Sequence, residues 1–247
     1  MKNTSYDNGF YKSRNNETLK SAKHVLDALF SHYKPNSVVD FGCGFGTWVK
    51  VCKELGVEKI KGMEGPWLDA NHLVIEKDEF EHADLTKPLE FKVKFDLAIT
   101  LEVSEHIIKN KADVFLDNLT KASDVVLFSA ALPNQGGVDH VNEQWPTYWI
   151  EKFLQRGFKV YDIIRPAVWN NEEVKLWYKQ NALLFVKDGI VIESLKNYKA
   201  NGMYDVVHPQ MFLKQVALRH PLHISYKDVL KYFPKMTLNA IKRMFSK

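Results

Sequence analysis

The sequence alternates short apolar runs with amphipathic stretches from residue 17 to residue 187. Short apolar runs bounded by turn residues are typical of buried strands, and amphipathic stretches are typical of helices that cover a sheet. The apolar runs predict strands at residues 37–41, 59–64, 73–77, 95–101, 124–129, 158–165 and 182–187. The amphipathic stretches predict helices at residues 17–33, 47–55, 113–121 and 146–156. This order predicts the α/β class, with a doubly wound, mostly parallel seven-stranded sheet.

Strand signals weaken beyond Lys187, where the chain is expected to form helical pieces that are broken at Gly202, Pro209, Pro221 and Pro234. From Lys187 to the end there are eleven Lys and Arg residues and four Asp and Glu residues, a net charge of +7, whereas the preceding residues carry −3. We therefore expect a main domain over residues 1–187 and a basic helical C-terminal extension over residues 188–247. A basic segment can attract nucleic acid, anionic lipid or a phosphorylated substrate, and scattered lysines also fit a solvated helical face.

Composition places the chain among ordinary globular proteins, with 45% hydrophobic and 26% charged residues in a length of 247. No apolar run is long enough to cross a bilayer, and the polar start of the chain lacks the apolar stretch of a secretory signal. The two cysteines, Cys43 and Cys52, form no metal-type pair, which argues against a zinc ribbon or a disulfide scaffold. We expect a cytoplasmic protein without a transmembrane segment.

A glycine-rich loop, VVDFGCGFGTW, joins the first predicted strand to a helix and contains Gly42, Gly44 and Gly46. Glycine lets a backbone turn sharply and approach a ligand closely. A dinucleotide fingerprint needs G-x-G-x-x-G, but Thr47 occupies its third glycine position. Asp40 lies two residues before the first glycine, where its carboxylate would repel a pyrophosphate and attract a cationic amino-acid group. The loop therefore favours S-adenosylmethionine over NAD, and an NAD-dependent dehydrogenase is a secondary alternative.

Residues 20–187 resemble the class I S-adenosylmethionine-dependent methyltransferases, which have a Rossmann-like sheet. VVDFGCGFG resembles the first motif of that family, IKGMEG the end of its second strand, HADLTKPL its adenine segment, and FDLAITLEVSEHI its fourth-strand motif. The resemblance implies that Glu64 binds the ribose hydroxyls, that the Asp84 carboxylate accepts from the adenine amine, and that the Leu85 backbone touches the adenine ring. It implies a cofactor-binding set made of Tyr11, Arg14, Asp40, Gly42, Cys43, Gly44, Glu64, Asp84, Leu85 and Glu102.

The stretch EVSEHI, residues 102–107, follows the predicted strand 95–101 and places Glu102, Glu105 and His106 at the cofactor side of the sheet. His140 follows the neighbouring strand on the same edge. A similar E-x-x-E-H with one later histidine binds a divalent metal in small-RNA terminal 2′-O-methyltransferases, so Glu102, Glu105, His106 and His140 are candidate ligands for Mg²⁺ or Mn²⁺. Without a metal, His140 first and His106 second are candidate general bases, with Glu105 beside them. The remaining alternative is a strand-to-helix junction with no chemical role.

The segment IIRPAVWNNEEVKLWYKQNALLFV resembles the end of the methyltransferase domain in stand-alone enzymes of surface-glycan biosynthesis, through Trp177, Tyr178, Gln180 and Asn181. The favoured function is O-methylation of a sugar, a nucleotide-linked sugar or a phosphorylated glycan precursor. An RNA ribose 2′-O-methyltransferase is the alternative within the enzyme class, although nucleic acid is not the favoured partner because no RNA-binding module signature is present. A third alternative is a binding module that keeps the fold but has lost catalysis, and the intact set of cofactor motifs argues against it.

Residues 1–16 precede the first predicted helix and include Tyr11 and Arg14. Such a segment can fold over the cofactor as a lid, with Arg14 near the cofactor carboxylate, or it can be an untethered start of the chain.

Overall fold

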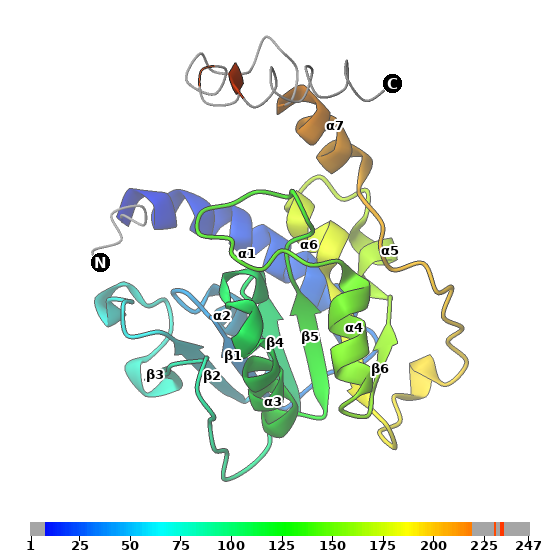
Figure 1. Cartoon of the computed structure of the whole chain (residues 1–247). Coiled ribbons are helices and arrows are strands. Elements are labelled where there is room, and N and C mark those ends of the chain that lie inside the picture. The colour runs from blue at the N-terminus through cyan, green and yellow to red at the C-terminus, as the bar shows by residue number, and fades with distance from the viewer. Residues whose placement is uncertain (1–7, 219–229, 231–232, 235–247) are drawn as a thin grey trace. The chain divides into compact units, whose positions relative to one another are not determined.

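The computed structural model describes residues 8–218, 230 and 233–234, and its centre is one seven-stranded sheet of order β3-β2-β1-β4-β5-β7-β6 (Figure 1). The strands are β1 (Ser37–Phe41), β2 (Lys59–Glu64), β3 (Phe80–His82), β4 (Leu97–Leu101), β5 (Val125–Ser129), β6 (Phe158–Tyr161) and β7 (Leu183–Lys187). All neighbours are parallel except β7, which is antiparallel to both β5 and β6. The predicted doubly wound, mostly parallel sheet is confirmed, and the strand order reverses between β1 and β4, where such sheets bind ligands.

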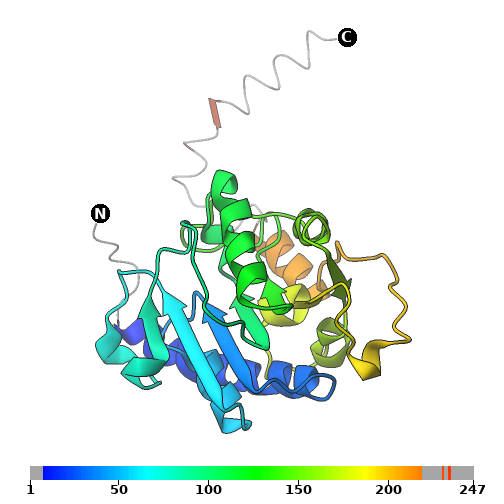
Figure 2. The ribbon, with the colours of Figure 1, turned by 90° about the horizontal axis from the view of Figure 1, so that it is seen from below.

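Helices cover both faces of the sheet, as the view in Figure 2 shows. One face packs on α1 (Asn8–Phe30), α2 (Thr47–Glu54), α5 (Ile164–Val168) and α6 (Leu176–Asn181), and the other on α3 (Ala112–Ala122) and α4 (Pro146–Leu154). Alternate strand residues point to opposite layers, so Val38 is buried in the first core and Val39 in the second. Strands buried on both faces explain why the sequence shows continuous apolar runs there.

The third predicted strand is wrong, because residues 73–76 form a loop, Lys77 begins the 3₁₀ turn Lys77–Glu79, and the third strand is β3, at residues 80–82. The apolar side chain of Ile75 covers the glycine loop: a Cβ added to Gly46 would lie 2.8 Å from Ile75 Cδ1. The Val74 backbone N–H donates to the carbonyl of Phe45, in the glycine loop, at 2.9 Å, so a hydrogen bond also attaches residues 73–76 to the glycine loop. The short apolar run at residues 73–77 resembles a strand in sequence because its apolar residues pack on the glycine loop.

Two other boundaries differ from those predicted. The strand predicted at residues 158–165 ends at Tyr161, because Asp162 and Arg165 pair with each other and α5 begins at Ile164. The first helix begins at Asn8 rather than at residue 17.

The segment after β7 packs on the sheet domain as far as Val206, where the first of two compact units ends. Ile192 and Leu195 are buried in the core of that unit, so part of the sequence assigned to the C-terminal extension belongs to its packing. The described part of the second unit contains α7 (Pro209–Leu218). Among the described residues, no helix has both the length and the apolar character that a bilayer span requires.

Candidate active site

The glycine loop lies against the end of β4. Gly42, Gly44 and Gly46 all have positive φ, at 79°, 53° and 87°, a backbone conformation that side-chain-bearing residues rarely adopt. A Cβ on Gly42 would lie 2.5 Å from Val103 Cγ2, so this glycine allows the loop to touch the stretch that carries Glu102. A Cβ on Gly44 would meet nothing within 4 Å, so its exposed face leaves space for a ligand.

Three carboxylates stand at the carboxyl ends of adjacent strands around this loop. Glu64, the last residue of β2, accepts from the backbone N–H groups of Gly44 at 3.1 Å and Gly65 at 2.8 Å. Asp40 in β1 is 2% exposed, and its Oδ2 atom has no hydrogen-bond partner among the described residues. Burial, with a smaller contribution from the Glu64 charge, raises the pKa of Asp40 well above its ordinary value. A buried carboxylate with an open oxygen is suited to a ligand that brings donors or positive charge.

Glu102, the third carboxylate, follows β4 with a φ of 59°, which is rare for a residue with a side chain. Its carboxylate accepts from Gln135 Nε2 at 2.7 Å and from Asn181 Nδ2 at 3.0 Å. Burial raises its pKa and these amide hydrogen bonds oppose the rise. Asn181 is the last residue of α6, which contains the WYKQN stretch. That stretch therefore contacts Glu102 directly. Neutral amides hold Glu102 in place without neutralising its charge.

The other predicted cofactor residues differ in their exposure to solvent. Asp84 is 43% exposed and accepts from the Thr86 hydroxyl at 2.6 Å and from Lys87 at 3.0 Å, so its carboxylate is part of a surface turn beyond β3. Leu85 is buried. Burial raises the pKa of the Cys43 thiol well above its ordinary value, which is typical of a packed, unreactive cysteine.

The side chains of Tyr11 and Arg14 lie outside the described part of the structure, and so do residues 1–7 of the predicted lid. Their contacts with a cofactor stay predictions.

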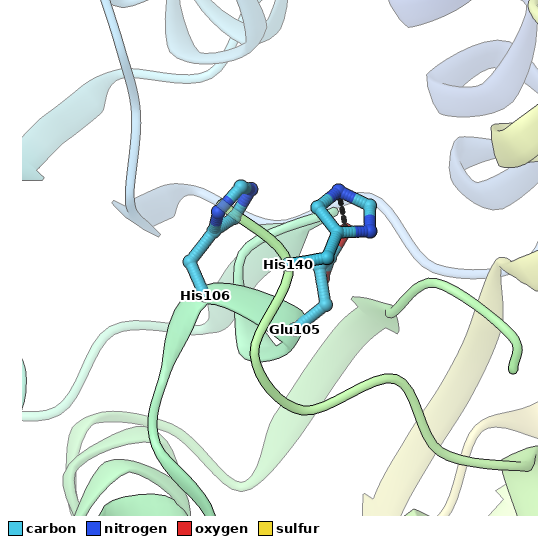
Figure 3. Close-up of side chains that lie close together, drawn as sticks. All are labelled: Glu105, His106 and His140. Carbon is cyan, nitrogen blue, oxygen red and sulfur yellow. Dashed lines mark ion pairs between the residues drawn. The ribbon is translucent and has the colours of Figure 1, made fainter. Parts of the chain in front are cut away.

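The side chains of Glu105, His106 and His140 lie close together (Figure 3). One ligand atom from each lies within 4.8 Å of the others, and the two imidazole rings are 4.9 Å apart in an edge-on arrangement. Glu105 and His106 belong to the 3₁₀ turn Ser104–His106, which follows β4. The Glu105 carbonyl accepts from the backbone N–H groups of Val141 and Asn142, both at 2.9 Å. These bonds attach the loop that carries His140 to the turn, which explains how residues far apart in sequence meet.

The Glu105 side chain is fully buried, and neither carboxylate oxygen has a partner at hydrogen-bond geometry among the described residues, although the backbone N–H groups of Glu105 and Ala131 lie close enough to lower its pKa in part. Its Oε1 faces His140 Nε2 at 3.9 Å, too long for a hydrogen bond. Burial and then the nearby charge of Glu102 raise the pKa of Glu105 well above its ordinary value. Unpartnered buried carboxylates are costly, and in native proteins each one calls for an explanation such as an absent ion or a catalytic role. Of the four predicted metal ligands, the structure groups these three and binds Glu102 instead to Gln135 and Asn181.

Sequence reasoning missed Glu143, which accepts from His140 Nδ1 at 2.9 Å. It also missed Gln135, which donates to Glu102. The spacing His140-x-x-Glu143 is a weak sequence signal for such a pair, whereas nothing near Gln135 in the sequence indicates its partner.

Comparison with known proteins gives the family of this site and fold. The family model described as methyltransferase domain matches residues 13–163, more than half of the chain. The chain therefore belongs to the methyltransferase-domain family and has the fold of the class I S-adenosylmethionine-dependent methyltransferases. A search of curated proteins found no match.

Solved structures share the fold at low sequence identity. A chain of the complex between the Haloferax volcanii Trm112 methyltransferase activator and a methyltransferase has a TM-score of 0.53 and 15% identity, over 72% of this chain and 94% of that chain. Magnesium protoporphyrin IX methyltransferase from Synechocystis, with bound S-adenosylmethionine, has a TM-score of 0.51 and 16% identity, over 74% and 86%. CalS10, an amino pentose methyltransferase from Micromonospora echinaspora, has a TM-score of 0.51 and 10% identity, over 76% and 99%.

The Glu64→Ala variant should bind S-adenosylmethionine roughly 5- to 150-fold more weakly, which corresponds to the loss of about 1–3 kcal/mol when buried hydroxyls are left unpaired. The same substitution frees the Gly44 and Gly65 N–H groups, which the carboxylate now holds. Titration calorimetry measures the change, and the surface variant Glu81→Ala serves as its control. Unchanged affinity in Glu64→Ala would contradict a ribose-binding role.

The Glu105→Gln variant should be more stable than the native chain at pH 7. The pKa of Glu105 is raised in the folded state, mainly by burial, so the native state holds this proton more tightly than the unfolded chain does. Raising the pH above the ordinary value of about 4.3 therefore weakens the native state, and a neutral amide removes that dependence. Urea unfolding should show a gain at pH 7 that shrinks as the pH falls towards 4. A loss of stability at pH 7 would contradict an uncompensated carboxylate.

Proposed function

We propose that this methyltransferase transfers a methyl group from S-adenosylmethionine to a hydroxyl group of a small polar acceptor, with His140 as the general base. The observation that carries the proposal is the placement of His140, whose Nδ1 is 2.9 Å from Glu143 Oε1 while its Nε2 faces Glu105. Methyl transfer is an in-line displacement, so the enzyme must align nucleophile, methyl carbon and sulfur. A hydroxyl nucleophile must also lose its proton, and a carboxylate-oriented imidazole is suited to remove it.

Asp40, Glu64 and Glu102 are the residues that would hold the cofactor. S-adenosylmethionine carries a sulfonium, an ammonium group and a ribose diol, which are cations and donors that carboxylates attract. The hydrogen-bond donors found for Glu64 and Glu102 are amides, so these charges are not neutralised by their partners. NAD would place a pyrophosphate among these carboxylates, which argues against a dehydrogenase.

The acceptor that we propose is a sugar, a nucleotide-linked sugar or a phosphorylated glycan precursor of surface polysaccharide biosynthesis. The resemblance of residues 163–186 to enzymes of that kind supports the choice. Those residues include α6, whose Asn181 donates to Glu102 beside the cluster, so the resembling segment is part of the site.

A metal-dependent ribose 2′-O-methyltransferase acting on RNA is the second candidate function. Glu105, His106 and His140 favour it, because they offer one carboxylate and two imidazoles within reach of one ion. His106 Nδ1 lies 3.3 Å from the Asp139 carbonyl oxygen, and His140 Nδ1 lies 2.9 Å from Glu143 Oε1. Metal-binding histidines usually donate their second ring N–H to a carbonyl or carboxylate in this way. One carboxylate and two imidazoles suit Mn²⁺ or a related transition metal better than Mg²⁺, which prefers oxygen ligands, and such an ion would supply a Lewis acid that grips a ribose diol.

Methyl-labelled S-adenosylmethionine separates the two functions. The protein is incubated with sugar phosphates, nucleotide sugars and a short RNA with a free 3′-terminal diol, each with and without chelator. The favoured proposal expects label on a sugar hydroxyl and no effect of chelator. Label on the RNA that disappears with chelator and returns with Mn²⁺ would establish the second function. Label on neither class would reject both acceptors.

A further inference from the structure

We propose that Glu143 and Gly137 are positioning residues, which set the orientation and the tautomer of His140 for the reaction. The inference rests on the proposed role of His140 as the base. Three donors converge on one carboxylate: Asn134 N at 2.7 Å, Gly136 N at 2.9 Å and His140 Nδ1 at 2.9 Å. Glu143 therefore fixes both the start of the loop and the imidazole that the loop presents.

The hydrogen bond to Glu143 also determines where the His140 proton lies. An ionised carboxylate only accepts hydrogen bonds, so the Nδ1 atom must carry the hydrogen in this contact. In the neutral ring the lone pair is then on Nε2, the atom that faces Glu105. A general base needs that lone pair available to the acceptor hydroxyl. The 3.9 Å between Nε2 and Glu105 Oε1 is too long for a hydrogen bond to occupy it, and without Glu143 both tautomers become accessible.

Gly137 controls the position of the same ring from its other side. A Cβ added to Gly137 would lie 2.1 Å from His140 Nε2 and 2.4 Å from Cε1, closer than any real contact. The ring therefore occupies the space that any other residue at 137 would fill. At the neighbouring Gly136 a Cβ would meet nothing within 4 Å, so the close approach is specific to Gly137.

The surroundings keep the loop from adjusting freely. Asn134 and Asp139 have φ values of 67° and 58°, which are costly for residues with side chains. The far end of the loop is attached through Val141 and Asn142 to the Glu105 carbonyl. Because the backbone of this loop is fixed at both ends, it cannot shift to make room for a side chain at residue 137. A small steric change at Gly137 should therefore move the His140 ring rather than the loop.

The first test reads the tautomer directly in the intact, chelator-treated protein. Long-range ¹H–¹⁵N spectra of the histidine rings are recorded for the native chain and for Glu143→Gln, with His140→Ala to assign the signal. We expect the Nδ1–H form of His140 in the native chain and a mixture in Glu143→Gln. The Nε2–H form in the native chain, or an identical pattern in both proteins, would overturn the role of Glu143.

The second test is a double-mutant cycle on turnover, using S-adenosylmethionine and the acceptor labelled in the assay above. Glu143→Gln and Gly137→Ala should each lower kcat at least 10-fold, with cofactor affinity within a few-fold of native as evidence of folding. The exposed loop variant Val138→Ala is the matched control. In a His140→Ala background, neither substitution should lower kcat further, because residues that act through one side chain are not additive.

The two proposals fail in different ways in this cycle. If His140→Ala alone turns over normally, the proposed base is wrong. If His140→Ala is slow but Glu143→Gln lowers kcat by the same factor in both backgrounds, His140 remains the base and only the positioning inference fails. Gly137→Ala gives the same decision should Glu143→Gln fail to fold.

Discussion

The His140→Ala variant should turn over roughly 10²- to 10⁴-fold more slowly than the native enzyme, the contribution usual for general acid–base catalysis. This loss corresponds to about 2.7–5.5 kcal/mol of transition-state stabilisation. The substitution removes the imidazole that faces Glu105 while Asp40, Glu64 and Glu102 keep their places around the glycine loop. We therefore expect kcat to fall while the affinity for S-adenosylmethionine, measured by calorimetry, stays within a few-fold of native.

Two comparisons make this result specific. His32→Ala removes an exposed histidine that hydrogen-bonds to Ser194, and it should leave turnover unchanged. His106→Ala tests the neighbouring ring, which is the second candidate base. Near-normal turnover in both His106→Ala and His140→Ala would reduce EVSEHI to a strand junction. A loss in His140→Ala that appears only without chelator would assign the histidine to a metal instead.

Most of the sheet could be predicted because burial on both faces leaves a direct mark in the sequence. β1, β4 and β5 are mostly apolar and buried along their length, and their apolar residues alternate between the two core layers. The error at residues 73–77 has the opposite cause. Ile75 and Val74 are apolar because they cover the glycine loop, and a pattern of single residues cannot distinguish a loop that packs from a strand that pairs.

The grouping of the three acids around the glycine loop was predictable for a related reason. Asp40, Glu64 and Glu102 each lie at or just beyond the end of a parallel strand, and strand ends meet at one edge of the sheet, so sequence position fixes the neighbourhood. The partners of these groups follow no such rule. Gln135 and Asn181 reach Glu102 from a loop and from α6, and only the folded chain brings them there.

The position of the His140 ring depends on a loop, and the sequence did not predict the geometry of that loop. Placing His140 near Glu105 needed only strand order, but its orientation depends on Glu143 folding back to Asn134 and Gly136. That turn requires positive φ at Asn134 and Asp139, which Asn and Asp tolerate but which hydrophobic periodicity does not indicate. Functional loops are held by such individual hydrogen bonds, so their geometry is the least predictable part of a site.

The Arg165→Met variant should lower the free energy of unfolding by about 3–5 kcal/mol, the usual loss when one member of a buried ion pair is removed. The side chains of Arg165 and Asp162 are 2% and 8% exposed, and the guanidinium donates to both Asp162 carboxylate oxygens at 2.8 and 2.6 Å. It also donates to the Tyr204 carbonyl at 2.7 Å, which ties the segment after β7 to α5. Methionine retains apolar contact but leaves a buried carboxylate without its partner.

A matched exposed pair separates this effect from a general sensitivity to lost charge. Lys159 and Asp188 lie 2.9 Å apart with side chains 65% and 57% exposed, so Lys159→Met should leave the free energy of unfolding nearly unchanged. Adding Asp162→Leu to Arg165→Met removes the stranded charge and should recover much of the loss, because replacing a whole buried pair by apolar residues is often close to neutral. Urea unfolding of the four proteins measures these differences. A loss in Arg165→Met as small as that in Lys159→Met would show that the pair does not hold the segment.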